Sequence, residues 1–180
     1  LILLANQKRD GKETSLSDLA HLSPDAPAHL IQSMTGATGP VSVVSTACTS
    51  SSQAIGEGLI KLRRGDVDAM IVGGVDVLVD PLMVTGFSLL GALSTRNEDP
   101  EAASRPFDSQ RDGFVLGEGA GFLILENEDR LAGRDPIGRL SGYGCSCNAY
   151  RITDSPPDGR GAAQSMKAAL IDADLKPTDI

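Results

Sequence analysis

Apolar residues along the chain form two kinds of pattern, short β-branched runs and stretches with helical spacing. Residues 41–45 (VSVVS) and 68–72 (DAMIV) are runs of the first kind, and each predicts a short buried strand. Two glycines at 73–74 are expected to end the second run. Residues 48–64 predict a helix that stops at Gly65. Its apolar positions are Ala54, Ile55, Leu59 and Leu62.

The remaining patterns continue this alternation of strands and helices. Residues 23–25 (SPD) predict a helix start, because Ser and Asp side chains bond the free N–H groups of a first turn. Residues 81–93 predict a helix, and residues 114–126 predict two short strands joined across a glycine turn. A strand is expected at 137–144 and an amphipathic helix at 161–173. The sequence therefore indicates a layered α/β fold with a mixed sheet.

Composition narrows the functional classes. The chain has 180 residues, and its net charge of −8 argues against a general nucleic-acid-binding surface. No apolar run approaches the roughly 18 residues that a membrane-spanning helix needs, so no membrane insertion is expected. Three cysteines are an odd number and favour reduced thiols in the cytoplasm. Because the chain starts at Leu1 and stops at Ile180 just after a helix, we expect it to be part of a larger enzyme.

Cys48 is the candidate for chemistry, since it stands between a predicted strand and a predicted helix. Free N–H groups and the positive end of the helix dipole favour a thiolate at such a position, and the thiolate is the nucleophilic form. The Cys48 N–H itself could face a developing oxyanion, as in a nucleophile elbow. Free cysteines are also among the most buried residues, so the spacing alone leaves a packing role open.

Several segments resemble the elongating β-ketoacyl-acyl carrier protein synthases, which are condensing enzymes of the thiolase superfamily. The segment STACTSSSQAIGEG around Cys48 is similar to the active-site segment of that family. Further similarity lies in GDVDAMIVGGVD, GFSLLGALSTRN, ASRPFDSQRDGFVLGEGAGFLILE, GYGCSCNAY and TDSPPDG. These segments follow the family's order and approximate spacing over residues 36–180.

The resemblance implies a thiolase-like α/β fold that is incomplete in this chain. Residues 1–35 match the family poorly, and no family property is assigned to them. Residues 36–135 would form the latter part of the N-terminal ketosynthase half, which carries the nucleophile. Residues 136–180 would begin the C-terminal half.

The resemblance also implies a 3-oxoacyl-[acyl carrier protein] synthase. Cys48 would accept an acyl group from acyl carrier protein, and malonyl-acyl carrier protein would then lose CO2 and elongate the chain. The family uses no metal or redox cofactor, so none is expected. It forms homodimers through a buried strand beside the active site, for which residues 41–45 are the candidate.

Three further residues match family positions. Phe87 would gate the acyl tunnel, although it could equally be a core phenylalanine. Thr153 and Ser155 would lie at the phosphopantetheine entrance, although hydroxyls in a Pro-rich loop are also ordinary turn residues. Arginines could meet the acidic carrier protein, but Arg105 and Arg111 lie near Asp108 and Asp112 and are expected to form internal ion pairs.

Three other patterns are given structural interpretations. Cys145 and Cys147 lack a Cys/His cluster nearby, so packing is favoured over a zinc site. Glu118 is expected to be a solvent-facing turn carboxylate. The glycines at 117, 119 and 121 lie between two predicted strands, which excludes a phosphate-binding loop.

The histidines leave alternatives open. The family's two catalytic histidines lie on HGT-type and late glycine-rich segments, which this chain lacks, and His21 and His29 lie in the part that matches poorly. This chain alone should therefore not complete a condensation. A polyketide ketosynthase shares the same motifs, and a non-condensing partner subunit or remnant is a second alternative. A cysteine hydrolase would need a histidine beside Cys48, and neither histidine has a motif that places it there.

Overall fold

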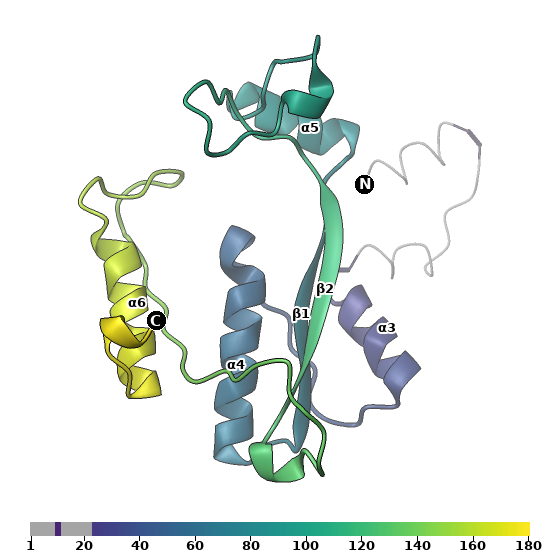
Figure 1. Ribbon diagram of the computed structural model, residues 1–180. Helices are drawn as coiled ribbons and strands as arrows, with labels where there is room; N and C mark the ends of the chain where they lie inside the picture. Colours follow the sequence, from purple (N-terminus) through teal and green to yellow (C-terminus); the bar gives the residue numbers. More distant parts are fainter. Residues whose placement is uncertain (1–9, 12–22) are drawn as a thin grey trace. The chain divides into compact units, whose positions relative to one another are not determined.

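The computed structural model describes residues 10–11 and 23–180 (Figure 1). The described residues divide into two compact units, one formed by residues 10–11, 23–41 and 75–121 and the other by residues 42–74 and 122–180. His21 lies outside the described residues. Within the part that is described, no helix has the length and apolar character that crossing a membrane requires.

The helix that follows Cys48 is α4, Ser50–Arg64. Gly65 ends it in the left-handed region at φ 73°, and the Gly65 N–H donates to the Leu62 carbonyl at 3.0 Å. Glycine adopts this conformation without a Cβ clash, which is why helices end there. The predicted helix and its stop at Gly65 are therefore confirmed.

Two strands, β1 (Ala69–Val77) and β2 (Glu118–Glu126), pair in a two-stranded sheet and run side by side in Figure 1. The prediction that glycines 73–74 end the first strand was wrong, because β1 continues to Val77. The prediction of two short strands within residues 114–126 was also wrong, since β2 is continuous through Gly119 and Gly121. Glycine weakens a strand but does not prevent an extended backbone when a neighbouring strand pairs with it.

Close packing of α4 on β1 forms the small core of the second unit. Leu59 and Leu62 of α4 and Val72 of β1 are buried. A Cβ on Gly58 would lie 2.5 Å from Val72 Cγ1, so the helix approaches the strand more closely than any larger residue would allow. The glycine at 58 thus sets the distance between α4 and β1.

The last long helix, α6 (Arg160–Ala173), confirms the predicted amphipathic helix to within one residue. Residues 137–144 form no strand, which corrects the prediction for that segment. A Cβ on Gly142 would lie 2.6 Å from the Ala169 carbonyl oxygen, so the segment runs directly against α6. Its Tyr143 N–H donates to the Asp172 carboxylate at 2.8 Å instead of to a neighbouring strand.

The first unit contains α3 (Ala26–Thr35) and α5 (Pro81–Leu89). The helix start expected at 23–25 is confirmed, with Asp25 as the residue before α3, but the expected capping bond is not formed, because the Asp25 carboxylate accepts from the Ser23 hydroxyl instead. The Asp80 carboxylate caps α5 by accepting from the Leu82 and Met83 N–H groups. This helix ends at Leu89 rather than at the predicted residue 93, since Gly91 turns the chain at φ 64°.

Short 3-10 turns occupy several connections. They are η1 (Ala47–Thr49), η2 (Pro100–Ala102), η3 (Glu128–Arg130) and η4 (Pro177–Asp179). An isolated parallel bridge joins Leu93 to Phe114. Residues 41–45 carry no strand assignment, which corrects the prediction for them. A strand is defined by ladder hydrogen bonds, and no described residue supplies a second strand beside this segment.

Candidate functional site

Cys48 lies in η1, directly before α4, and its side chain is exposed. The predicted place at the N-terminal end of a helix is therefore confirmed. The packing interpretation does not describe this structure, because a thiol at the surface contributes little to a core. An exposed thiol at a helix N-terminus is open to a substrate carbonyl and close to the positive end of the helix dipole.

Ala47 gives the turn before Cys48 its shape. Its φ is 53°, in the left-handed region that side chains other than glycine rarely adopt. This conformation costs a non-glycine residue about 1–2 kcal/mol, so the surrounding structure must hold it. The chain therefore makes a sharp, strained turn one residue before the thiol.

Ser50 bonds both sides of this turn. Its Oγ accepts from the Thr46 N–H at 2.8 Å and donates to the Ala47 carbonyl at 2.7 Å. The Ser50 N–H donates to the same Ala47 carbonyl. Ser50 thus bonds the peptide group before Thr46 and the peptide group after Ala47, which are the two ends of the residue pair 46–47.

A second hydroxyl group supports the same turn. Thr49 Oγ1 donates to the Thr46 carbonyl at 2.9 Å and lies 3.1 Å from Thr46 Oγ1. The Gln53 amide donates to Thr49 Oγ1 at 3.3 Å, one helical turn further along α4. The small polar residues around Cys48 therefore form a bonded network rather than a loose polar patch.

Gly74 of β1 supports the first turn of α4. A Cβ on Gly74 would overlap Ser51 Oγ and lie 3.1 Å from Ser51 Cβ. The helix N-terminus next to Cys48 therefore rests directly on the strand backbone. This contact explains why a glycine lies inside a strand where the sequence alone suggested an end.

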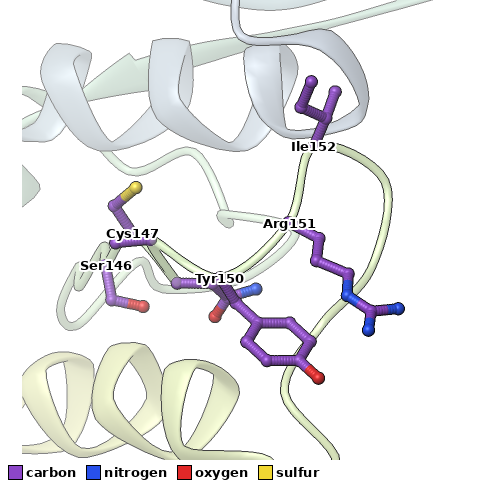
Figure 2. Close-up of a pocket in the computed structure, with 7 residues that line it drawn as sticks. Ser146, Cys147, Tyr150, Arg151 and Ile152 are labelled. Carbon is purple, nitrogen blue, oxygen red and sulfur yellow. The ribbon is translucent and has the colours of Figure 1, made fainter.

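A shallow pocket of about 510 Å³ lies along the loop at residues 146–152. Figure 2 shows the Tyr150 ring and the Arg151 guanidinium on one side of the loop and Ile152 pointing the other way. The Arg151 guanidinium lies 5.4 Å from the centre of the Tyr150 ring, and its Nη1 is 3.2 Å from Asp154 Oδ2. Both contacts join exposed neighbouring residues of the loop that leads to Thr153 and Ser155.

Thr153 and Ser155 are both exposed in this loop. The Ser155 hydroxyl accepts from the Asn148 amide at 3.2 Å. Phe87 is half-buried in α5, which belongs to the other unit from Cys48. The phosphopantetheine role of Thr153 and Ser155 and the acyl-binding role of Phe87 stay predictions.

The charged residues considered from the sequence have other partners than expected. Among the described residues, neither Arg105 nor Arg111 pairs with a carboxylate, so the predicted internal ion pairs were wrong. Arg111 Nη1 donates to the Asp108 carbonyl at 3.0 Å, while the buried Nε and Nη2 of Arg105 bond no residue that the structure describes. The Asp112 carboxylate instead accepts from the Ser94 hydroxyl and the Thr95 N–H.

Two residues expected to have no catalytic role have local contacts. The Glu118 side chain is exposed and accepts from the Val79 N–H at 3.3 Å. His29 is exposed in α3, where its Nε2 lies 3.2 Å from Asp25 Oδ2. Each contact joins residues of the same unit, and neither residue is assigned a part in the chemistry of Cys48.

Asp172 joins α6 to α4 and to the segment between them. Its carboxylate accepts from the Tyr143 N–H at 2.8 Å and from Arg63 Nη1 at 2.7 Å, and Arg63 Nη2 donates to the Ser141 carbonyl. The Tyr143 N–H, followed by the Arg63 guanidinium, lowers the pKa of Asp172 below its ordinary value of 3.8. The ionised carboxylate is therefore part of the folded structure.

Tyr143 packs on α4 from the opposite side to the strand. A Cβ on Gly56 would overlap the Tyr143 ring, so the ring lies directly on the helix backbone. Burial raises the pKa of the Tyr143 hydroxyl, and a hydrogen bond with Cys145 adds to the effect. Cys145 and Cys147 are exposed free thiols, so the packing interpretation given to them was wrong.

A model of the beta-ketoacyl synthase N-terminal domain matches residues 3–130. This match covers more than half of the chain and includes the Cys48 turn and both strands. The chain belongs to the beta-ketoacyl synthase family. The match begins at residue 3, so it includes most of the segment 1–35, which was expected to match the family poorly. The division at residues 35 and 135 stays a prediction.

Two curated relatives share one name. The chain is 49% identical over 144 residues to 3-oxoacyl-[acyl-carrier-protein] synthase 2 of Synechocystis sp., and 41% identical over 161 residues to the protein of that name in Staphylococcus aureus. These matches cover 79% and 88% of this chain. They cover only 35% and 40% of the relatives, so the chain spans well under half of their length.

Solved structures agree with the family match. One contains a type II polyketide synthase acyl-carrier protein in complex with its ketosynthase bound to the hexaketide; the TM-score is 0.88 and the identity 35%. That similarity covers 96% of this chain and 44% of the other chain. The predicted thiolase-like α/β fold of a ketosynthase is therefore confirmed.

Sequence reasoning missed the part that Ser50 plays in the turn. The sequence shows only a row of serines and threonines after Cys48, and a row of that kind does not tell which hydroxyl bonds which backbone group. A usable signal was the spacing, since a Ser or Thr three residues after a carbonyl in a helical turn bonds back to it.

Proposed function

We propose that this chain is the nucleophile-bearing part of a 3-oxoacyl-[acyl carrier protein] synthase, with Cys48 as the acyl acceptor. The observation that carries the proposal is the exposed Cys48 thiol at the N-terminal end of α4, in a member of the beta-ketoacyl synthase family. The names of the relatives at 41% and 49% identity support this activity over other reactions of a cysteine nucleophile.

The first half-reaction is an acyl transfer. The Cys48 thiolate attacks the thioester carbonyl of an acyl group carried by acyl carrier protein, and a tetrahedral oxyanion forms. In this scheme the Cys48 N–H and the positive end of the α4 dipole stabilise the developing negative charge. The carrier thiolate then leaves and takes up a proton, and the acyl group remains on Cys48 as a thioester.

The second half-reaction forms the carbon–carbon bond. Malonyl-acyl carrier protein loses CO2, and the electron pair of the broken bond becomes an enolate. The enolate carbon attacks the acyl-Cys48 carbonyl, and the Cys48 thiolate leaves. The product is a 3-oxoacyl chain two carbons longer on the carrier. No metal or redox cofactor takes part in this scheme.

The histidines that this second step uses in the family lie on segments absent from the 180 residues. We therefore propose that the residues described here supply the nucleophile and that the enolate is stabilised elsewhere in the protein. A non-condensing partner subunit is less well supported, because the thiol is present and exposed.

A polyketide ketosynthase is the second candidate. It is favoured by the structural similarity to the ketosynthase bound to a hexaketide, at 35% identity. The higher identities to the 3-oxoacyl synthases favour fatty-acid elongation. The two candidates share the Cys48 step and differ only in the chain that is extended.

The partners and location proposed are an acyl carrier protein, a second copy of this protein, and the cytoplasm. The named carrier protein in the similar complex supports the first. Exposed Val41 and Val43 support a homodimer through residues 41–45. Three free thiols support a reducing compartment.

Intact-protein mass spectrometry tests the proposed function. Full-length protein is mixed with acyl-loaded carrier protein, and the expected result is one added acyl group, absent in Cys48→Ala. Cys147→Ala is the matched control, since it removes another exposed thiol and should leave the added mass unchanged. Failure of the folded wild-type protein to gain the acyl group would overturn the proposal.

The same assay separates the two candidate pathways. Carrier proteins loaded with saturated acyl groups of several lengths are compared with carriers loaded with polyketide intermediates, and the rates of acyl transfer are measured. A preference for the saturated chains supports fatty-acid elongation, and the reverse preference supports the polyketide alternative.

A further inference from the structure

The Ser50 side chain is placed to control the turn that presents Cys48. Its hydroxyl uses its donor on the Ala47 carbonyl at 2.7 Å and an acceptor site on the Thr46 N–H at 2.8 Å. These two groups lie at either end of the strained residue pair 46–47, immediately before the thiol. A change at Ser50 therefore acts on the backbone that leads into Cys48.

We propose that Ser50 is a positioning residue for Cys48, which holds Ala47 in its left-handed conformation during acyl transfer. The inference rests on the proposed function of Cys48 as acyl acceptor. Ser50 does not touch the reacting atoms in this scheme. It acts through the turn, by fixing where the Cys48 thiol and the Cys48 N–H lie relative to each other.

The conformation of Ala47 supplies the physical reason. Alanine at φ 53° relaxes towards the right-handed or extended regions unless its neighbours prevent it. Such a rotation would turn the Ala47–Cys48 peptide group and move the Cys48 N–H away from the place where an oxyanion forms. Ser50 opposes this rotation through the Ala47 carbonyl, which belongs to the same peptide group as the Cys48 N–H, while Thr49 holds the Thr46 carbonyl on the other side of Ala47.

A purely structural role for Ser50 predicts a different outcome. Ser50 is the first residue of α4, and a hydroxyl there could simply stabilise the start of the helix. Loss of that stabilisation would lower the melting temperature and leave the acyl-transfer rate of the folded protein unchanged. The rate of the folded protein therefore distinguishes the two roles.

The first experiment measures transfer of an acyl group from carrier protein to Cys48 in the full-length protein under single-turnover conditions, where kcat is the limiting rate constant and KM is the carrier concentration that gives half of it. For Ser50→Ala, kcat is expected to fall about tenfold, the effect of losing one or two hydrogen bonds, while KM stays within about twofold. Ser50→Thr keeps the hydroxyl and is expected to retain most of the wild-type kcat. Ser52→Ala is the matched control, because Ser52 bonds no described residue through its side chain and lies two residues further along the helix.

A second experiment tests the connection to Ala47. Glycine adopts positive φ without strain, so Ser50→Ala should lower kcat less in an Ala47→Gly background than in the wild type. An equal loss in both backgrounds, or an unchanged kcat in Ser50→Ala, overturns the positioning role. Circular dichroism and the melting temperature establish that each variant is folded.

The proposal and the underlying function fail in different ways. If the wild type accepts no acyl group, the proposed function fails, and the rate at which iodoacetamide alkylates Cys48 then reports how accessible and reactive the turn makes the thiol. Slower alkylation in Ser50→Ala, with Ser50→Thr and Ser52→Ala as fast as the wild type, supports the positioning role on its own. Alkylation at the wild-type rate in Ser50→Ala overturns it.

Discussion

Ala47 is the residue whose conformation most directly fixes the place of the Cys48 thiol. A glycine at this position would adopt φ 53° freely, but it would also adopt many other conformations. Alanine in this conformation costs about 1–2 kcal/mol, but alanine has fewer alternative backbone conformations than glycine. Neutral hydrogen bonds worth about 0.5–1.5 kcal/mol each offset this cost. The Ser50 and Thr49 bonds are of the right number and size to do so.

Gly74 gives a prediction about the effect of adding one Cβ atom beside the first turn of α4. A Cβ at this position would overlap Ser51 Oγ and approach Ser51 Cβ, so Gly74→Ala should lower the free energy of unfolding by about 1–2 kcal/mol. Thermal unfolding of the full-length protein measures the change. Because the clash involves the first turn of α4, the acyl-transfer rate of the folded variant should fall as well.

Two companion variants sharpen this prediction. Ser51→Ala removes the overlapping Oγ, so Gly74→Ala should cost less in that background. Gly138→Ala is the matched control, since a Cβ there would meet nothing within 4 Å. The predicted contact is contradicted if Gly74→Ala costs the same with and without the Ser51 hydroxyl.

At the scale of elements, α4 is held on both sides by contacts that only glycine permits. Gly58 lets it approach Val72 of β1, and Gly56 lets the Tyr143 ring lie on its backbone. Arg63 near its end bonds Asp172 of α6 and the Ser141 carbonyl. The helix that begins beside Cys48 is therefore fixed along its length, and its first turn gains rigidity from contacts far from the thiol.

The Asp172 contacts predict a pH-dependent stability. The folded protein lowers the pKa of Asp172 below 3.8, because the ionised carboxylate accepts from Tyr143 and Arg63. Its contribution is therefore fully present above the ordinary pKa of 3.8 and is lost as the pH falls through the lower folded-state value. Asp172→Asn should melt at a lower temperature than the wild type at pH 7, and the difference should narrow as the pH falls below 3.8.

Melting temperatures of the full-length protein between neutral pH and the acid range measure this effect. Asp66→Asn is the control, because Asp66 is exposed and its carboxylate has no partner among the described residues. It should melt like the wild type over the whole range. A difference for Asp172→Asn that is the same at every pH would contradict a role for the ionised carboxylate.

The sequence predicted correctly the helices and turns whose formation depends mainly on their own residues. Helices α4 and α6 follow from a local spacing of apolar side chains, and Gly65 follows from the geometry of a helix end. The place of Cys48 before α4 follows from the same local rules, and the family followed from motifs in order.

Strands were predicted less well because they depend on partners. Residues 41–45 and 137–144 have β-branched or apolar runs, yet no described strand pairs with either segment. β2 crosses two glycines because β1 lies beside it. The hydrogen bonds of Ser50 were not predicted for a related reason. Several hydroxyl residues lie near one another in the sequence, and the backbone geometry of the folded chain determines which of them bonds which group.

At the scale of the whole molecule, much apolar surface is left uncovered. Only four hydrophobic residues of the described chain are buried, whereas large side chains such as Leu89, Ile124 and Phe107 are strongly exposed. Soluble proteins rarely expose large contiguous apolar patches unless another surface covers them. The relatives are more than twice as long as the matched region, so the rest of a longer protein could cover part of this apolar surface. The second copy in the proposed homodimer could cover another part.

The proposed homodimer gives the last prediction. Val41 and Val43 are 39% and 45% exposed in a segment that was predicted to be apolar on both faces. If a second copy covers this segment, Val43→Asp places a charge in a dry interface and should shift the full-length protein from dimer towards monomer. Sedimentation velocity measures the shift. Gln164→Asp on α6 is the matched control, because it adds the same charge at an exposed polar residue and should leave the dimer intact. A Val43→Asp protein that is folded and fully dimeric would place the subunit interface elsewhere in the protein.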